Sequence, residues 1–249
     1  MLKLFLRLIL GDLVWERIGQ AKQEFKYRKL KFHCEEALVP IFQRYFQKKN
    51  GFYVDVGSND GRSVSNTYDL EKSKNWSGIL IEPIMHVHFR SRQIRSLQKN
   101  QFVNCALVSH DFEGETVKLL YSGLMTVMVE GSEFKSEYWA NVGSQFLSRG
   151  EVVQATWSSA RTLDSVLSEF NAPTRIDLLS IDVEGSEMQV LNGTNFSKYV
   201  FDYILIETDL NSKAFKFLTQ KGYHYLESVN QNMLFAHQSQ IDSRSKLAR

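Results

Sequence analysis

Short apolar runs alternate with amphipathic stretches over the middle of the chain. Five runs are each typical of a buried strand, and they occupy residues 52–56, 78–83, 102–108, 175–183 and 201–208. Three stretches between them have the helix formers and periodicity of crossover helices, at residues 62–74, 84–100 and 184–193. Near-continuous apolar strands that alternate with helices predict an α/β fold, in which helices cover both faces of a parallel sheet.

The alternation of apolar runs and amphipathic stretches is interrupted in two places. Residues 223–229 and 232–237 are strand-like but only two residues apart, which is too short for a helical crossover and predicts an antiparallel pair. Two further strands, at 115–122 and 151–158, flank a less regular segment, so residues 121–150 are a candidate lid or insertion. Thr162 is placed to cap a short helix over residues 162–170.

These patterns divide the chain into an N-terminal helical extension (1–50), a main domain (51–237) and a polar tail (238–249) that we expect to fray. Apolar residues at helical spacing within residues 1–20 predict an amphipathic helix that is too short to span a membrane. Packing against protein is the favoured interpretation, with peripheral contact to an anionic membrane as the alternative.

Composition and charge limit the classes of function that the protein can have. The formal net charge of the 249 residues is +2 and the basic residues are scattered, which argues against a nucleic-acid partner. Cys34 and Cys105 have no CxxC spacing, so we expect reduced thiols and a cytoplasmic protein.

A glycine turn follows the first apolar strand, in the sequence YVDVGSNDG (53–61). Ligands of open parallel sheets bind beyond the carboxyl ends of the strands, where this turn lies. The turn lacks the middle glycine of a dinucleotide fingerprint and the Lys of a P-loop. Asp55 and Asp60 would repel a pyrophosphate, so the turn favours a neutral or cationic ligand.

Glu82 lies 25 positions after Gly57, at the end of the next strand, where a carboxylate can accept hydrogen bonds from ribose hydroxyls. A glycine turn rich in acids, combined with a ribose-binding acid, predicts a pocket for a positively charged nucleoside. S-adenosylmethionine, with its sulfonium and amino-acid tail, is such a ligand. We expect it to contact Asp55, Gly57, Ser58, Asn59, Gly61, Glu82, Pro83 and Asp182.

The sequence also resembles the FkbM-type S-adenosylmethionine-dependent methyltransferases. The resemblance covers roughly residues 51–210 and rests on YVDVGSNDG, SNTYDLEK, GILIEP, RTLDSVL, LLSIDVEGSEMQVLNG and YILIET. It implies a Rossmann-like, seven-stranded methyltransferase sheet with an antiparallel last strand. It also implies methyl transfer to a hydroxyl, in many relatives that of a sugar or a polyketide-like acceptor. Asn104 and Ala106, at the end of the third strand, are added to the residues expected to contact S-adenosylmethionine, because methyltransferase folds commonly contact adenine at that place. The sequence does not identify the acceptor, which we expect to be a small molecule or glycan.

The candidate catalytic residues are acids at the same sheet edge. Asp182 is expected near the methyl-transfer centre, with Glu184 as general base and Glu207 completing an acidic cluster. Glu184 and Glu187 would share a face of a helix that began there. Three carboxylates can also hold a divalent metal, but the expectation is that no metal is used. A nicotinamide-dependent oxidoreductase, a non-catalytic binding module and a carboxylate–metal hydrolase remain alternatives.

Overall fold

The computed structural model describes residues 32–130, 136–147 and 151–247. The predicted helix in residues 1–20, with its candidate membrane contact, and parts of the candidate lid lie outside these residues. Within the described ranges, no helix is both long and apolar enough to cross a membrane.

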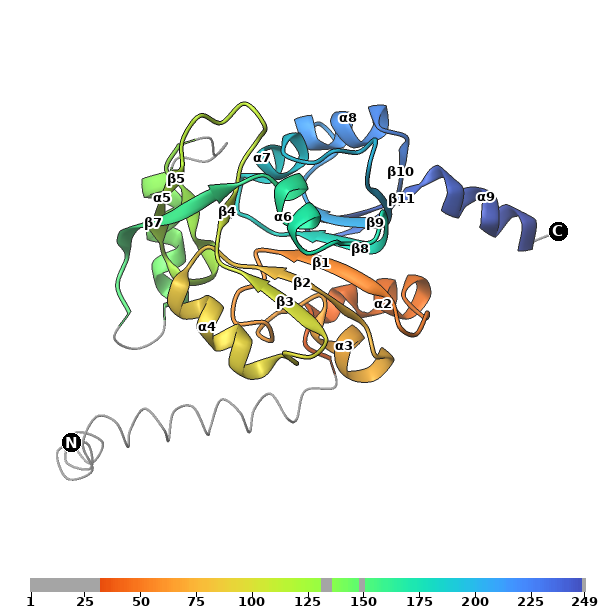
Figure 1. Cartoon of the computed structure of the whole chain (residues 1–249), viewed down its shortest axis with the longest axis horizontal. Helices are drawn as coiled ribbons and strands as arrows, with labels where there is room; N and C mark the ends of the chain where they lie inside the picture. The colour runs from red at the N-terminus through yellow and green to blue at the C-terminus, as the bar shows by residue number, and fades with distance from the viewer. Residues whose placement is uncertain (1–31, 131–135, 148–150, 248–249) are drawn as a thin grey trace, which may run out of the picture.

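A seven-stranded sheet in the order β10-β11-β9-β8-β1-β2-β3 forms the centre of the molecule (Figure 1). Its strands are β1 (Phe52–Val56), β2 (Ser77–Ile81), β3 (Asn100–Val103), β8 (Arg175–Ile181), β9 (Val200–Glu207), β10 (Tyr223–Val229) and β11 (Asn232–His237). The first five of these run parallel, whereas β11 is antiparallel to both β9 and β10. The predicted sheet, with its antiparallel last strand, is confirmed.

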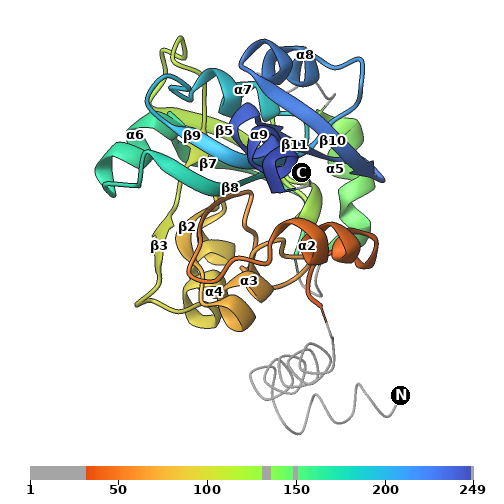
Figure 2. The same cartoon turned by 90° about the vertical axis from the view of Figure 1, so that its right-hand side faces the viewer.

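Helices cover both faces of this sheet (Figures 1 and 2). One layer contains η1 (Glu36–Leu38), α2 (Val39–Tyr45), α3 (Tyr68–Lys74) and α4 (Met85–Ile94). The opposite layer contains α6 (Leu163–Glu169), α7 (Glu187–Asn192) and α8 (Lys213–Gln220). Thr162 caps α6 as predicted, because its Oγ1 accepts a hydrogen bond from Ser165 N at 3.2 Å.

The alternation of side chains along β1 separates two cores. Val54 and Val56 pack in the cluster that contains the apolar faces of α6, α7 and α8, whereas Tyr53 packs with α2 and α3. Ile41 of α2 is 1% exposed in this second cluster. The helical layer therefore begins within the first 50 residues and is continuous with the domain.

Several element boundaries differ from the predicted ones. The helix expected from residue 62 begins only at Tyr68, since the chain first makes turns that include Val64 at φ 55°. The apolar run 102–108 divides between β3 and β4 (Ala106–Leu107). The C-terminal residues that we expected to fray form α9 (Gln238–Leu247), which projects from β11 in Figure 1.

A second, four-stranded sheet in the order β4-β7-β5-β6 stands beside the main one. Its strands β5 (Thr116–Tyr121) and β7 (Gln154–Arg161) correspond to the strands expected at 115–122 and 151–158, the second shifted by three residues. They pair antiparallel, and β6 (Val127–Met128) extends the sheet. The candidate lid between them contains η2 (Gly123–Met125), α5 (Ser136–Gly143) and η3 (Ser144–Phe146). The main sheet and this smaller sheet meet around the site described next.

Candidate functional site

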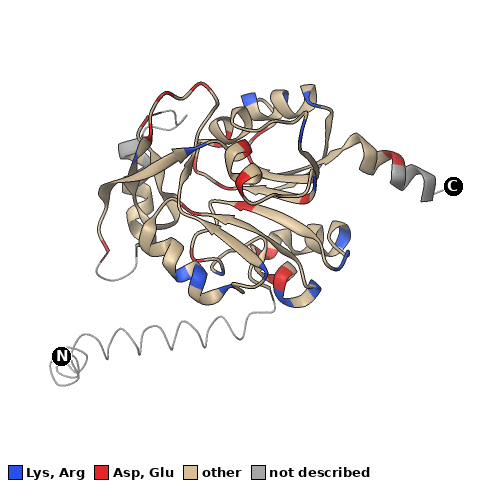
Figure 3. Cartoon of the chain, viewed as in Figure 1, with Lys and Arg blue, Asp and Glu red and all other residues tan. Residues whose placement is uncertain are grey.

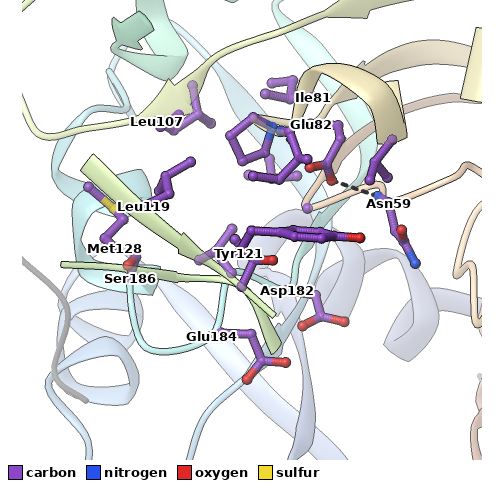
Figure 4. Close-up of a pocket in the computed structure, with 18 of the residues that line it drawn as sticks. Asn59, Ile81, Glu82, Leu107, Leu119, Tyr121, Met128, Asp182, Glu184 and Ser186 are labelled. Atoms are coloured by element: carbon purple, nitrogen blue, oxygen red, sulfur yellow. Dashed lines mark hydrogen bonds between the residues drawn. The ribbon is translucent and has the colours of Figure 1, made fainter. Parts of the chain in front are cut away.

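Two adjoining cavities open where the parallel strands end. The first, of about 80 Å³, is mostly apolar, and its side walls include Ile81, Leu107, Leu119 and Met128 (Figure 4). The second is larger, at about 700 Å³, and most of its lining residues are polar or acidic. They share five lining residues: Gly57, Asn59, Leu124, Asp182 and Glu184. The two cavities therefore form one continuous site with an apolar and a polar end.

Gly57 brings the ends of β1 and β8 close together. Its φ of 80° is in the left-handed region, and a Cβ at this position would lie 1.7 Å from the carbonyl oxygen of Asp182. Only glycine fits both conditions without moving the backbone. The nitrogens of Gly57 and Ser58 both donate to Ile81 O, at 3.0 and 3.1 Å, which ties the turn to the end of β2.

Glu82 stands just beyond β2, 6% exposed, in the wall of the first cavity. Its Oε2 accepts from Asn59 N at 3.0 Å and its Oε1 accepts from Ile84 N at 2.8 Å (Figure 4). Burial outweighs these two hydrogen bonds and raises the pKa of Glu82 to about 7. Each carboxylate oxygen has capacity for a further hydrogen bond, so the group can accept two donors from a ligand.

Asp55 faces the second cavity from the end of β1. It is 5% exposed, and its Oδ2 accepts from Thr67 Oγ1 at 2.5 Å. Burial raises its pKa, and the bond from Thr67 opposes that rise. Thr67 in turn accepts from Arg95 Nη1 at 3.1 Å, and Arg95 forms a buried ion pair with Glu71. Asp55 is therefore the inner end of a buried polar network.

Asp182, Glu184 and Glu207 form the acidic cluster that the sequence predicted as a group. Each offers a carboxylate oxygen, and these oxygens lie within 4.8 Å of one another. Burial, followed by the charge of neighbouring carboxylates, raises the pKa of all three, that of Glu184 to about 9. The charge of Glu207 adds to the rise in the pKa of Asp182, which lies in the wall shared by the two cavities.

The backbone directs Glu184 into this cluster. Glu184 and Gly185 have φ of 52° and 86°, and a non-glycine residue in this region carries strain. The helix α7 begins only at Glu187, whose Oε1 accepts from Gly185 N at 3.0 Å. The expectation that Glu184 and Glu187 share a helix face is therefore wrong: a left-handed turn, not a helix, orients Glu184.

Three residues that the sequence analysis singled out in this region lie outside the linings of both cavities. Gly61 packs against the side chain of Arg95, and its carbonyl accepts from Arg95 Nη1 at 2.8 Å. Asn104 Nδ2 donates to the carbonyls of Glu82 and Pro83, at 2.8 and 3.0 Å. Asp60 accepts from Ser63 N at 2.7 Å and serves its own turn, so its charge is not evidence about the ligand.

The second sheet adds residues that the sequence analysis missed. Tyr121, 4% exposed, lines the first cavity, and in the view of Figure 4 its ring lies between Glu82 and Asp182. His86 packs edge-on to this ring at 5.0 Å, with its Nε2 3.2 Å from the Tyr121 hydroxyl. The strand alternation of 115–122 places Leu119 and Tyr121 on one face, which was the available signal.

Comparisons with known proteins identify the family of the chain. Residues 55–230 match the Methyltransferase FkbM domain. No curated protein matches the chain. Among solved structures, the chain is similar to the methyltransferase FkbM of Methylobacillus flagellatus KT, with 16% identity and a TM-score of 0.43, covering 76% of this chain and 44% of that one.

Two further solved structures are similar at lower scores. The precorrin-6y C5,15-methyltransferase of Geobacter metallireducens GS-15 has 10% identity and a TM-score of 0.38, over 82% of this chain and 92% of that one. A methyltransferase of Pyrococcus furiosus has 11% identity and a TM-score of 0.36, over 79% and 80%. The family assignment rests on the domain match, which includes the glycine turn, Glu82 and the acidic cluster. This chain belongs to the FkbM methyltransferase family.

Proposed function

We propose that this protein transfers a methyl group from S-adenosylmethionine to a hydroxyl group of a sugar, glycan or similar small acceptor. The methyltransferase domain is established by the family match. The donor, the acceptor and the atom that is methylated are the proposal. One observation carries most of it: an apolar cavity with a buried carboxylate opens directly into a polar cavity lined by acids.

The first cavity has the chemistry that the adenosine part of the donor requires. Leu107, Leu119 and Tyr121 provide apolar and aromatic surface for a heterocycle, and Glu82 can accept from two ribose hydroxyls. The side-chain oxygen of Ser186, in the same wall, is buried without a hydrogen-bond partner among the described residues, so a polar ligand group fits there too. The residues present therefore fit the donor.

The turn between the cavities suits the charged part of the donor. Gly57 leaves no side chain in the way, and Asp55 and Asp182 place negative charge on the side where a sulfonium and an ammonium would lie. When bound, S-adenosylmethionine supplies a methyl carbon already activated by its sulfonium. The protein then has to orient an acceptor, keep water out and take up a proton.

The acidic cluster provides the group that takes up this proton. A hydroxyl is a weak nucleophile and gains from a base that removes its proton during attack. Without a cation beside it, the pKa of Glu184 is raised to about 9, so its carboxyl is protonated near neutral pH. The positive charge of the donor lowers that pKa, so Glu184 can act as the base once the donor is bound. Asp182 and Glu207 lie beside Glu184 and raise its pKa, so the three carboxyl groups take up and release protons as one cluster. Turnover should therefore depend on all three acids.

Isothermal titration calorimetry with S-adenosylhomocysteine and with NAD separates this proposal from its alternatives. We expect S-adenosylhomocysteine to bind and NAD to show no heat. Binding of NAD alone would indicate an oxidoreductase. Incubation with methyl-labelled donor and a fractionated glycan extract then tests turnover: donor binding with no labelled product in any fraction would indicate a non-catalytic module.

A further inference from the structure

The second cavity has more acidic groups than a neutral acceptor requires. Its wall contains the carboxylates of Glu35, Asp55, Asp182, Glu184, Glu207 and Asp209, and none of its described lining residues is Lys, Arg or His. At about 700 Å³ the cavity is of the size that holds small-molecule ligands. A ligand in it is surrounded by acids from several elements.

None of these acids forms an ion pair within the described part of the chain. Glu35 Oε2 accepts from the neutral amide of Asn230 at 3.1 Å, and Asp209 Oδ1 accepts from Asn211 N at 2.7 Å. The ion pairs among described residues leave out Glu35, Glu184 and Glu207. In Figure 3 the blue Lys and Arg positions lie largely on the outer helices α2, α3, α4 and α8.

A buried hydroxyl in the wall of this cavity also indicates a polar ligand group. Ser58 lines it, is 4% exposed, and has a side-chain oxygen with no hydrogen-bond partner among the described residues. A buried hydroxyl without a partner is costly unless a ligand satisfies it. An ammonium group has both N–H donors and a positive charge. It can therefore donate to this hydroxyl and also pair with the acids.

We infer that the acceptor carries a protonated amine, as an amino sugar does, and that anionic acceptors such as sugar phosphates are rejected. This inference rests on the proposed function and deepens it. The donor contributes positive charge near Asp182, but Glu35, Glu207 and Asp209 extend the acidic wall beyond the shared turn. A neutral sugar leaves these carboxylates repelling one another, and a phosphate adds to the repulsion.

Matched oligosaccharides test the inference with the full chain. Calorimetry at saturating S-adenosylhomocysteine compares the fully deacetylated chitin tetramer with its N-acetylated counterpart, glucosamine with N-acetylglucosamine, and both with tetragalacturonate. We expect each amine to bind at least about tenfold more tightly than its acetylated partner, with affinity falling as salt rises, and no binding of tetragalacturonate. Equal or tighter binding of the acetylated members overturns the inference.

A pair of rim variants assigns the effect to this cavity. Glu35→Gln combined with Asp209→Asn removes two charges while keeping side-chain size, and should weaken binding of the deacetylated tetramer roughly tenfold at low salt. Glu36→Gln, an exposed neighbour outside the cavity, is the matched control and should change nothing. An unchanged affinity in the double variant contradicts the inference.

The same experiments separate this inference from the proposed function. If S-adenosylhomocysteine itself does not bind, the proposed function fails. If it binds and labelled methyl appears only on a neutral or acidic glycan, the methyltransferase stands and the cationic acceptor is wrong. Transfer to a neutral glycan that requires added Mg²⁺ or Mn²⁺ likewise overturns the inference, because the carboxylates then hold a metal.

Discussion

The buried ion pair of Glu71 and Arg95 should be a main support of the donor-binding loop. Their side chains are 1% and 0% exposed, with Oε2 and Nε 2.6 Å apart. Arg95 Nη1 also donates to Gly61 O at 2.8 Å and to Thr67, the partner of Asp55. Arg95→Met leaves Glu71 as a buried, uncompensated charge, which costs about 3–5 kcal/mol of unfolding free energy.

A double-mutant cycle isolates this effect from the loss of packing. Arg95→Met with Glu71→Gln removes both charges and should be less destabilising than Arg95→Met alone, since no charge remains buried. Urea unfolding followed by tryptophan fluorescence measures each free energy, and Arg90→Met, on the exposed part of the same helix, is the control. A loss below about 1 kcal/mol in Arg95→Met, or additive losses in the double variant, would refute the reasoning.

The pH dependence gives a second readout of the same pair. Burial raises the pKa of Glu71, but the charge and hydrogen bonds of Arg95 outweigh it and lower that pKa on balance. The stabilisation is therefore fully present above the unfolded-state pKa and is lost as pH falls through the folded-state value. Without Arg95, burial raises the pKa instead, so the stability gap between wild type and Arg95→Met should narrow from pH 7 to pH 4.

Three further predictions concern the site itself. Because the pKa of Glu82 is raised to about 7, S-adenosylhomocysteine should bind more tightly at pH 8 than at pH 6, and calorimetry of Glu82→Gln should show no such change. Gly57→Ala should abolish this binding and lower the melting temperature, since its Cβ would lie 1.7 Å from Asp182 O; normal binding would contradict the geometry. The folded-state pKa of Glu184 is raised to about 9, so its contribution to stability is lost as pH rises. The melting temperature of Glu184→Gln should therefore increase relative to that of the wild type between pH 5 and pH 9. A constant difference between the two melting temperatures would argue against the raised pKa.

The features that the sequence predicts correctly depend on local patterns. Apolar runs and glycine punctuation predict the parallel sheet, and the two-residue gap before residue 232 predicts the antiparallel strand. Strand ends also identify Asp55, Glu82, Asp182 and Glu207, because the carboxyl ends of parallel strands meet at one edge.

The features that the sequence does not predict depend on long-range packing. The run 102–108 is continuous in sequence but divides between two sheets, because Ala106 pairs with Ala160 while Val103 pairs with Ile81. Tyr121 enters the site only through that second sheet. Glu184 was expected on a helix, but its backbone is in the left-handed region and α7 begins only at Glu187.

The central claim is that the nucleoside of the methyl donor lies in the apolar cavity, with its ribose against Glu82. A crystal structure of the complex with S-adenosylhomocysteine tests it most directly. We predict that the heterocycle lies between Leu107 and Tyr121 and that both ribose hydroxyls donate to the Glu82 carboxylate. The sulfur should be directed toward Asp182. A bound nucleoside outside this cavity, or ribose hydroxyls that leave Glu82 without contact, would contradict it.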